Sequence, residues 1–200
     1  MESLPLIGIP DSAFLSFSDR PGLMTKKEVR SLVIAELEIQ ANQIIWDIGA
    51  GTGSVSIEIA RLSPSSQIYA IEKTAIGITL ITQNSQRFAV SNIKPISEKA
   101  PVSLQALPKP DRIFIGGSGG NLRPILDTCQ SEINPRGIIV LAFATIEHLN
   151  EARQWAQQNN WQDSLLQVQL SRSLAIANLT RFNPLNPVTI IKLQKNGSAN

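Results

Sequence analysis

One stretch of the chain carries glycines at a spacing that could bind a small molecule. It reads Asp47-x-Gly49-x-Gly51-x-Gly53 and follows directly on an apolar run at residues 44–48. Glycine tolerates positive φ and leaves the backbone bare, so a ligand can approach the main chain closely. A buried strand, a glycine loop and the start of a helix together place free N–H groups at the carboxyl end of the strand, where open α/β sheets bind ligands.

The spacing of these glycines excludes two phosphate-binding loops. The dinucleotide fingerprint G-x-G-x-x-G needs a glycine at position 54 or 56, and serines stand at both. A Walker loop needs Gly-Lys-Ser/Thr, and this loop has no lysine. The pattern therefore disfavours a nicotinamide dehydrogenase. A glycine-rich turn without a ligand is the other interpretation, which the length and flanks of the loop disfavour.

An acidic residue follows at the distance that a nucleoside site requires. Glu72 lies near the end of a predicted strand over residues 67–73, nineteen positions beyond Gly53. Nucleotide-binding folds place a carboxylate on the ribose hydroxyls at about this interval, and a carboxylate can accept from both hydroxyls at once. The alternative is a surface acid that pairs with Lys73 or caps the next helix. Together with the glycine loop, the ribose role is favoured.

A second glycine cluster stands at the end of another predicted strand. Residues 111–115 run straight into Gly-Gly-Ser-Gly-Gly at positions 116–120. Four glycines in five residues again leave the backbone bare at the carboxyl end of a strand. We expect a second substrate to approach the site there.

Length and composition bound the class of protein. The 200 residues are 42% hydrophobic and 17% charged, which is typical of one globular domain. The net charge of +2 gives no strong basic field, so nucleic acid is not an expected partner. The single Cys129 excludes an internal disulfide. No apolar run approaches the ~20 residues of a membrane helix, and the first residues lack a signal-peptide pattern, which predicts a cytoplasmic protein.

Alternating strand and helix patterns predict an α/β fold. The first five predicted strands cover residues 44–48, 67–73, 93–96, 111–115 and 138–143. After a helix over 149–158, two strand-like runs at 165–170 and 187–193 are joined by a loop rather than a helix. This ending predicts a Rossmann-like, doubly wound sheet of seven strands with an antiparallel last strand, the class I methyltransferase arrangement and not that of dehydrogenases.

The two ends of the chain are predicted to differ from the regular domain. Residues 1–23 mix proline, glycine and large apolar residues, which indicates an irregular N-terminal arm lying on the domain. The stretch Thr25-Lys26-Lys27-Glu28 has the form of a capping box and predicts a helix with Thr25 at its N-cap. The regular domain is expected over 24–195, followed by a loose polar tail at 196–200.

The glycine loop resembles motif I of class I S-adenosylmethionine-dependent methyltransferases. Four stretches taken together are similar to the precorrin/cobalt-precorrin carbon-15 methyltransferases of cobalamin biosynthesis, and the most specific is Gly-Gly-Ser-Gly-Gly. They are residues 8–14, 24–30, 46–56 and 114–120. The resemblance runs from about residue 7 to 193. It implies S-adenosylmethionine as methyl donor, methylation of precorrin-6 at carbon 15 with loss of an acetate carboxyl, a homo-oligomer such as a tetramer, and a carbon-5 methyltransferase as partner.

The resemblance also implies which residues contact the cofactor. They are Thr25, Gly49, Ala50, Gly51, Thr52, Gly53, Glu72 and Ala100. One position departs from the family, which usually has Gly-Asp-Ala-Pro-Glu where this chain has Glu98-Lys99-Ala100-Pro101-Val102. A lysine therefore stands at position 99 in place of an acid, and Glu98 or the backbone at Ala100 is left to recognise the adenine.

The implied chemistry needs positioning more than acid–base catalysis, because a sulfonium methyl group is already activated. We therefore expect no metal and no catalytic triad, and we assign no catalytic residue. A substrate with many carboxylates calls for basic side chains at the rim of the site. The candidates are Arg20, Lys26, Arg172 and Arg181.

Two other functions stay open at this point. Motif I is shared with methyltransferases that act on transfer RNA or on other small molecules, although an RNA enzyme should carry a basic stripe or an added module. The chain could also be a non-catalytic subunit that only binds S-adenosylmethionine. Transfer of a labelled methyl group would separate catalysis from binding.

Overall fold

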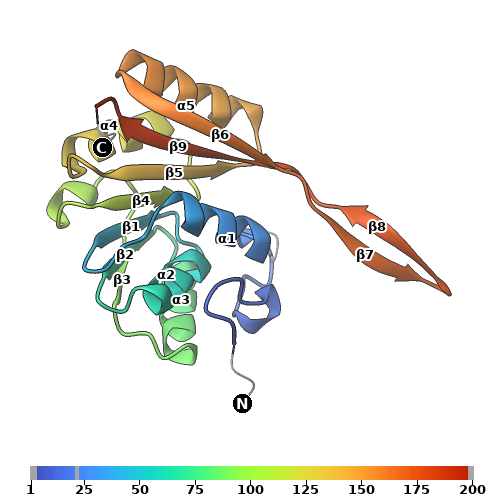
Figure 1. The fold of residues 1–200 in the computed structure, drawn as a ribbon. Coiled ribbons are helices and arrows are strands. Elements are labelled where there is room, and N and C mark those ends of the chain that lie inside the picture. The colour runs from blue at the N-terminus through green and yellow to red at the C-terminus, as the bar shows by residue number, and fades with distance from the viewer. Residues whose placement is uncertain (1–3, 21–22, 198–200) are drawn as a thin grey trace.

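A seven-stranded sheet organises the part of the chain that the structure describes, residues 4–20 and 23–197 (Figure 1). In this computed structural model the strand order is β3-β2-β1-β4-β5-β9-β6. The strands are β1 (Ile44–Ile48), β2 (Gln67–Glu72), β3 (Ile93–Ser97), β4 (Arg112–Ile115), β5 (Ile138–Phe143), β6 (Trp161–Val168) and β9 (Val188–Lys195). β1 to β5 are parallel, whereas β9 runs antiparallel to both β5 and β6. The predicted fold class is confirmed.

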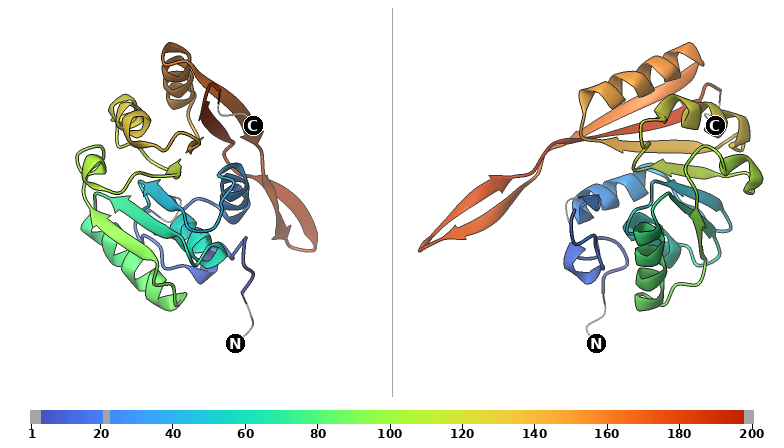
Figure 2. Two further views of the ribbon diagram at one scale, coloured as in Figure 1. Left: turned by 60° about the vertical axis from the view of Figure 1, so that its left-hand side comes forward. Right: turned by 180° about the vertical axis from the view of Figure 1, so that it is seen from behind.

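Helices cover both faces of this sheet (Figure 2). Their bounds are α1 (Lys27–Glu36), α2 (Ser54–Leu62), α3 (Ala75–Arg87), α4 (Leu122–Glu132) and α5 (Ile146–Gln158). Two apolar cores result, one between the sheet and α1, α2 and α3, the other between the sheet and α4 and α5. Because both faces are covered, β1 is apolar at nearly every position, as expected for a central parallel strand. α5 begins three residues before the predicted start, and β6 ends two residues before the predicted end.

The N-terminal arm packs firmly on the domain. Its apolar residues Ile9, Phe14 and Phe17 are buried, and the Phe14 ring lies 4.7 Å from that of Phe88. A short 3-10 turn, η1 (Asp11–Ala13), lies within the arm, and another, η3 (Leu104–Ala106), follows β3. Residues 198–200 of the predicted tail lie outside the described residues.

The predicted capping box at the start of α1 is wrong. The N-cap residue is Lys26, not Thr25, and no side chain of the cap residue binds the helix. The free N–H of Lys27 instead donates to Asp11 Oδ1 at 3.0 Å. A carboxylate from the arm therefore satisfies the helix terminus, a long-range contact that a local motif cannot reveal.

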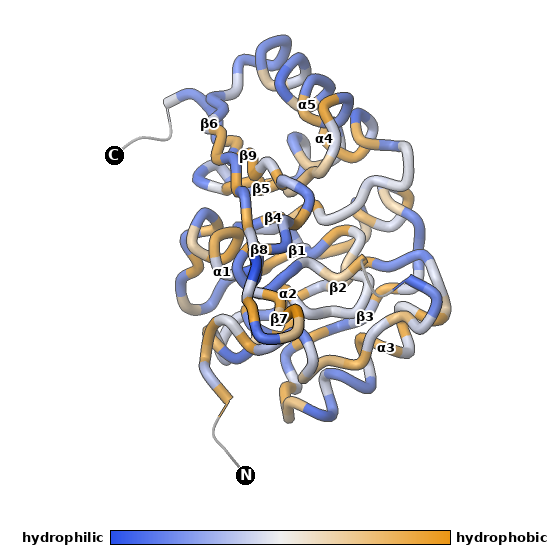
Figure 3. Tube along the Cα trace, turned by 90° about the vertical axis from the view of Figure 1, so that its right-hand side faces the viewer, coloured by the Kyte–Doolittle hydropathy of each residue, from blue (hydrophilic) through white to orange (hydrophobic). Residues whose placement is uncertain are grey.

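The predicted loop between the last two strands of the sheet is wrong as well. It is a two-stranded hairpin of β7 (Ser171–Ile176) and β8 (Leu179–Pro184), which extends away from the body (Figures 1 and 2). Every residue of both strands is exposed. The tube coloured by hydropathy shows hydrophobic segments along this hairpin (Figure 3). The hairpin was missed because neither of its faces is buried on the domain, so no alternation of burial marks it.

None of the described helices combines the length and the apolar character that crossing a membrane would require.

Candidate functional site

A cleft of about 260 Å³ opens at the carboxyl ends of β1, β2 and β4. Four of the predicted cofactor residues line it, namely Gly49, Gly51, Glu72 and Ala100. A cavity of about 30 Å³ shares several lining residues with the cleft and brings in three more, Thr25, Ala50 and Thr52. The eighth, Gly53, lines neither space. It is the N-cap of α2 and has a φ of +76°.

The two glycine loops touch each other through their backbones at the floor of this cleft. Gly49 has a φ of +75°, and a Cβ added to it would lie 2.5 Å from the Gly117 oxygen. The Gly116 N–H donates to the Ile48 carbonyl at 2.9 Å, which continues the pairing of β1 with β4. Both loops were recognised from their composition, but their mutual contact follows only from the pairing of β1 with β4.

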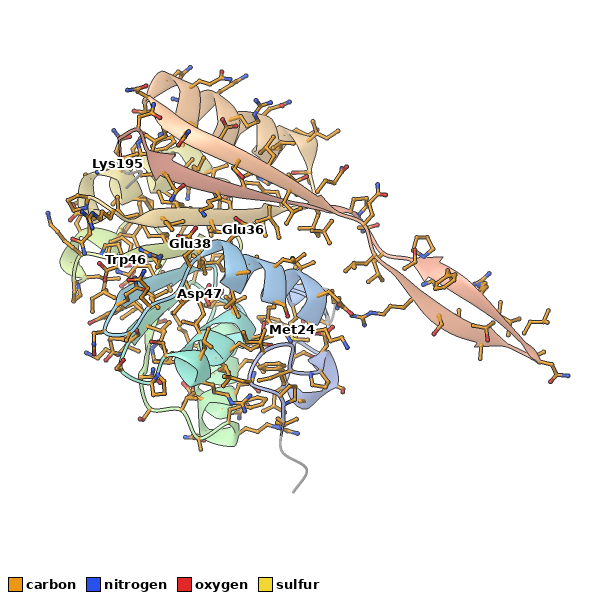
Figure 4. The ribbon with its side chains drawn as sticks, viewed as in Figure 1. Met24, Glu36, Glu38, Trp46, Asp47 and Lys195 are labelled. Atoms are coloured by element: carbon orange, nitrogen blue, oxygen red, sulfur yellow. The ribbon has the colours of Figure 1, made fainter. Side chains whose placement is uncertain are left out.

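Asp47, the first residue of the glycine motif, is a buried acid with a free oxygen. Its side chain is in the interior of the molecule (Figure 4), and the residue is 1% exposed. Oδ2 accepts from the Ser56 N–H at 3.2 Å and from the Ser56 hydroxyl at 2.5 Å, whereas Oδ1 has no partner among the described residues. Burial raises the pKa of Asp47 to about 6, although the bonds from Ser56 oppose this shift. The residue lines the small cavity, so its free oxygen suits a cationic ligand group.

Asp47 was not among the predicted site residues. It could have been identified from the sequence, because it is the acidic residue that begins the glycine motif.

Glu72 holds the glycine loop and the next turn together. Its Oε2 accepts from the Gly51 N–H at 3.1 Å, and its Oε1 accepts from the N–H and the hydroxyl of Thr74, both at 2.8 Å. Thr74 in turn caps α3 by accepting from the Gly77 N–H. No ion pair with Lys73 is found in the described part of the chain. Glu72 also lines the cleft, where a carboxylate keeps spare acceptor capacity for hydroxyl donors.

The predicted carboxylate-binding residues do not gather at the cleft. Only Arg20 lines it. Arg172 lies at the base of the hairpin, 2.8 Å from a Glu28 oxygen and 3.5 Å from an Asp11 oxygen, and Arg181 lies on the exposed strand β8. Lys26 lines neither the cleft nor the small cavity. The prediction placed the joining segment beside the site, whereas the hairpin carries it away from the body.

A buried arginine anchors the arm that forms one wall of the cleft. Arg30 is fully buried, and its guanidinium donates to Glu58 Oε1 at 2.8 Å, to Asp11 Oδ1 at 3.0 Å and to the Thr25 carbonyl. The Glu58 carboxylate also accepts the N–H groups of Gly8 and Ile9. These bonds hold the arm at residues 8–11 and again at Thr25. Between these points lie Phe17, Arg20 and Leu23, which line the cleft.

Asn84 ties the arm to the glycine loop directly. Its side chain is fully buried, accepts from the Leu15 N–H at 2.8 Å, and donates to the carbonyls of Leu15 and Thr52 at 2.9 Å each. Farther along the arm, a Cβ on Gly51 would lie 3.8 Å from the Phe17 ring. The arm is therefore part of the site, and neither Arg30 nor Asn84 was a residue that the sequence singled out.

Fold and site together define the class of protein. The sheet is parallel except for the antiparallel strand β9, a glycine loop follows β1, and an acid ends β2. This is the arrangement of class I S-adenosylmethionine-dependent methyltransferases. A solved SAM-dependent O-methyltransferase from Thermotoga maritima shares this fold with a TM-score of 0.70 at 15% identity. The match covers 86% of this chain and 66% of that one.

Within this class, the chain belongs to the precorrin methyltransferase family, because residues 16–195 match the family described as precorrin methyltransferase domain. It is 38% identical over 186 residues to the cobalt-precorrin-6B C(15)-methyltransferase (decarboxylating) of Salmonella typhimurium, covering 92% of this chain and 95% of that protein. The crystal structure of precorrin-6y C5,15-methyltransferase from Geobacter metallireducens aligns with a TM-score of 0.91 at 34% identity, covering 98% of this chain and 100% of the other. The predicted family is confirmed.

Proposed function

We propose that this chain transfers a methyl group from S-adenosylmethionine to carbon 15 of a precorrin-6 ring and releases an acetate carboxyl as carbon dioxide, in cobalamin biosynthesis. The observation that carries the proposal is the contact between the glycine loops after β1 and β4, which creates a backbone-lined cleft at the strand ends. The chain also shares 38% identity with a relative named for this reaction.

The residues around the cleft fit S-adenosylmethionine. The methionine part of that cofactor carries an ammonium and a carboxylate, and Asp47 offers a buried acceptor that has no partner in the described part of the chain and lines the small cavity. We assign Thr25 and residues 49–53 to the methionine part, Glu72 to the ribose and Ala100 to the adenine. Gly49 supports this assignment because any side chain there would collide with the opposite loop.

The task of this chain in the reaction is positioning. S-adenosylmethionine supplies a methyl group that its sulfonium centre has already activated. Residues of the arm wall the cleft, with Phe17 buried and Leu23 exposed, and hold the two reactants together while limiting access of water. The electron pair released with carbon dioxide passes into the conjugated ring of the substrate, so no side chain has to carry it. We assign no catalytic acid or base.

The hairpin supports association of several copies of the chain. Leu179 and Phe182 are both 76% exposed, and Leu174 and Ile176 are 44% exposed. A two-stranded ribbon is marginally stable by itself, and its free edges can pair with another chain. We therefore infer a homo-oligomer built through the hairpins. A carbon-5 methyltransferase as partner and a cytoplasmic location stay predictions.

The test is an anaerobic incubation of the full chain with methyl-labelled S-adenosylmethionine and precorrin-6, in separate arms with and without cobalt. Mass spectrometry should detect a product that has gained the labelled methyl and lost one carboxyl group. Cofactor binding without any transfer to the tetrapyrrole would contradict the proposal and support a non-catalytic subunit. Label found instead on added transfer RNA would support an RNA methyltransferase.

A further inference from the structure

Two lysines line the cleft with ammonium groups that have no partner among the described residues. Lys73 directly follows β2, and Lys99 lies in the segment after β3. Within the described ranges, neither side chain takes part in a hydrogen bond or an ion pair. The two lysines share one concave space with the glycine loops.

Lys73 reaches from the cofactor half of the cleft to the second glycine loop. Its Nζ lies 3.2 Å from the point that a Cβ on Gly119 would occupy, so glycine at that position permits the close approach. The loop leads into α4, whose N-cap residue Asn121 makes no side-chain cap bond. α4 begins three residues after Gly119, so the positive end of its dipole adds to the positive potential of this loop.

Two acids, Glu72 and Glu98, also line the cleft, but neither forms an ion pair with Lys73 or Lys99 within the described residues. Glu72 is buried and its two oxygens already accept from Gly51 and Thr74. Glu98 is exposed and forms no ion pair with either lysine in the described part of the chain. Together with Arg20, the lysines give the cleft three basic side chains against two acidic ones, and basic side chains in a concave site attract anionic ligands. The free cations therefore call for an anionic group on the ligand.

We propose that Lys73, with Lys99 in the same cleft, binds peripheral carboxylates of the tetrapyrrole and so determines substrate specificity. The inference rests on the proposed function and names the residues that replace Arg172 and Arg181 in this role. A carboxylate paired with an ammonium is stabilised as an anion, which opposes loss of carbon dioxide. The carboxylates held here are consequently side chains that survive the reaction, not the acetate group that is lost.

The first test measures binding without catalysis. Uroporphyrin, which carries carboxylates around its whole rim, is titrated into the full chain by calorimetry, and S-adenosylhomocysteine is titrated separately. Lys73→Met keeps the length of the side chain but removes the charge, and should raise the dissociation constant for uroporphyrin about tenfold, between the effects typical of exposed ion pairs and of charge-assisted hydrogen bonds. Lys73→Arg should retain most of the affinity. Affinity for S-adenosylhomocysteine should not change.

Lys109→Met is the matched control. Lys109 is also exposed, but it lies three residues before β4, at the amino-terminal end of the strand, whereas the cleft lies at the carboxyl ends. This variant should bind uroporphyrin like the wild type. Raising the salt concentration should weaken binding to the wild type more than to Lys73→Met, since screening acts on the charge that the variant lacks.

The outcomes separate this inference from the proposed function. Unchanged uroporphyrin affinity in Lys73→Met, no binding by the wild type, or an equal loss of affinity for S-adenosylhomocysteine would each overturn it. With precorrin-6 as substrate, Lys73→Met should raise KM and leave kcat nearly unaltered. A wild type that binds uroporphyrin through Lys73 but methylates no precorrin would refute the proposed function and leave the carboxylate site standing.

Discussion

Replacing Gly49 with alanine should force apart the two glycine loops that form the cleft. The φ of +75° at Gly49 costs an L residue about 1–2 kcal/mol. The new Cβ would also lie 2.5 Å from the oxygen and 2.8 Å from the nitrogen of Gly117. Because both are backbone atoms, no rotation of a side chain relieves the contact, and one of the loops must move.

The expected magnitude follows from comparison with two other glycines. Gly120 has a φ of +84° but no atom of the described residues within 4 Å of an added Cβ, so Gly120→Ala should lower the free energy of unfolding by about 1–2 kcal/mol. Gly117 lacks a positive φ, and an added Cβ there would have no neighbour within 4 Å in the described ranges, so Gly117→Ala should be close to neutral. Overpacking adds about 1–3 kcal/mol, which gives about 2–5 kcal/mol for Gly49→Ala.

Urea unfolding followed by tryptophan fluorescence would measure these differences. The same proteins, titrated with S-adenosylhomocysteine, should show the largest loss of affinity in Gly49→Ala, because its displaced loop lines both the cleft and the small cavity. If Gly49→Ala and Gly120→Ala agreed within about 0.5 kcal/mol, a typical effect of a surface substitution, the close contact between the loops would be refuted.

Three further predictions test the buried acid Asp47, the buried arginine Arg30 that anchors the arm, and the β7–β8 hairpin. Burial raises the pKa of Asp47 to about 6, above its value in the unfolded chain, so folding favours the protonated acid. The free energy of unfolding of the wild type should therefore fall relative to that of Asp47→Asn by up to about 3 kcal/mol as the pH rises from about 4 to about 6. Urea titrations would measure both free energies of unfolding, and an equal change with pH in the two proteins would contradict burial of Asp47 as the cause. Arg30→Met leaves Glu58 buried without its partner and should lower the free energy of unfolding by about 3–5 kcal/mol; a loss below about 1 kcal/mol would mean that the anchor is dispensable. Leu179→Ser combined with Phe182→Ser should reduce the mass measured by light scattering to that of one chain, whereas an unchanged oligomer would exclude the hairpin as its interface.

Much of the fold could be predicted because its signals are local. Apolar runs ending in glycine marked β1 and β4, and an apolar run marked β5, since strands buried on both faces must be apolar throughout. The positive φ required at Gly49 explains why glycine recurs in the first loop. The start of α1 could not be predicted correctly, because the carboxylate of Asp11 that satisfies it comes from another segment.

By itself, the sequence determined the alternation of strands and helices from β1 to β5, the backbone-lined loops after β1 and β4, and the family of the protein, because these depend on residue types at short spacings. Only the tertiary structure decided that Gly49 and Gly117 touch, that Arg30 fastens the arm beside the cleft, and that Lys73 lies in the cleft while Arg172 does not. Each of these contacts joins segments far apart in the chain. Their distances depend on how strands pair and helices pack, which no local pattern of residues specifies.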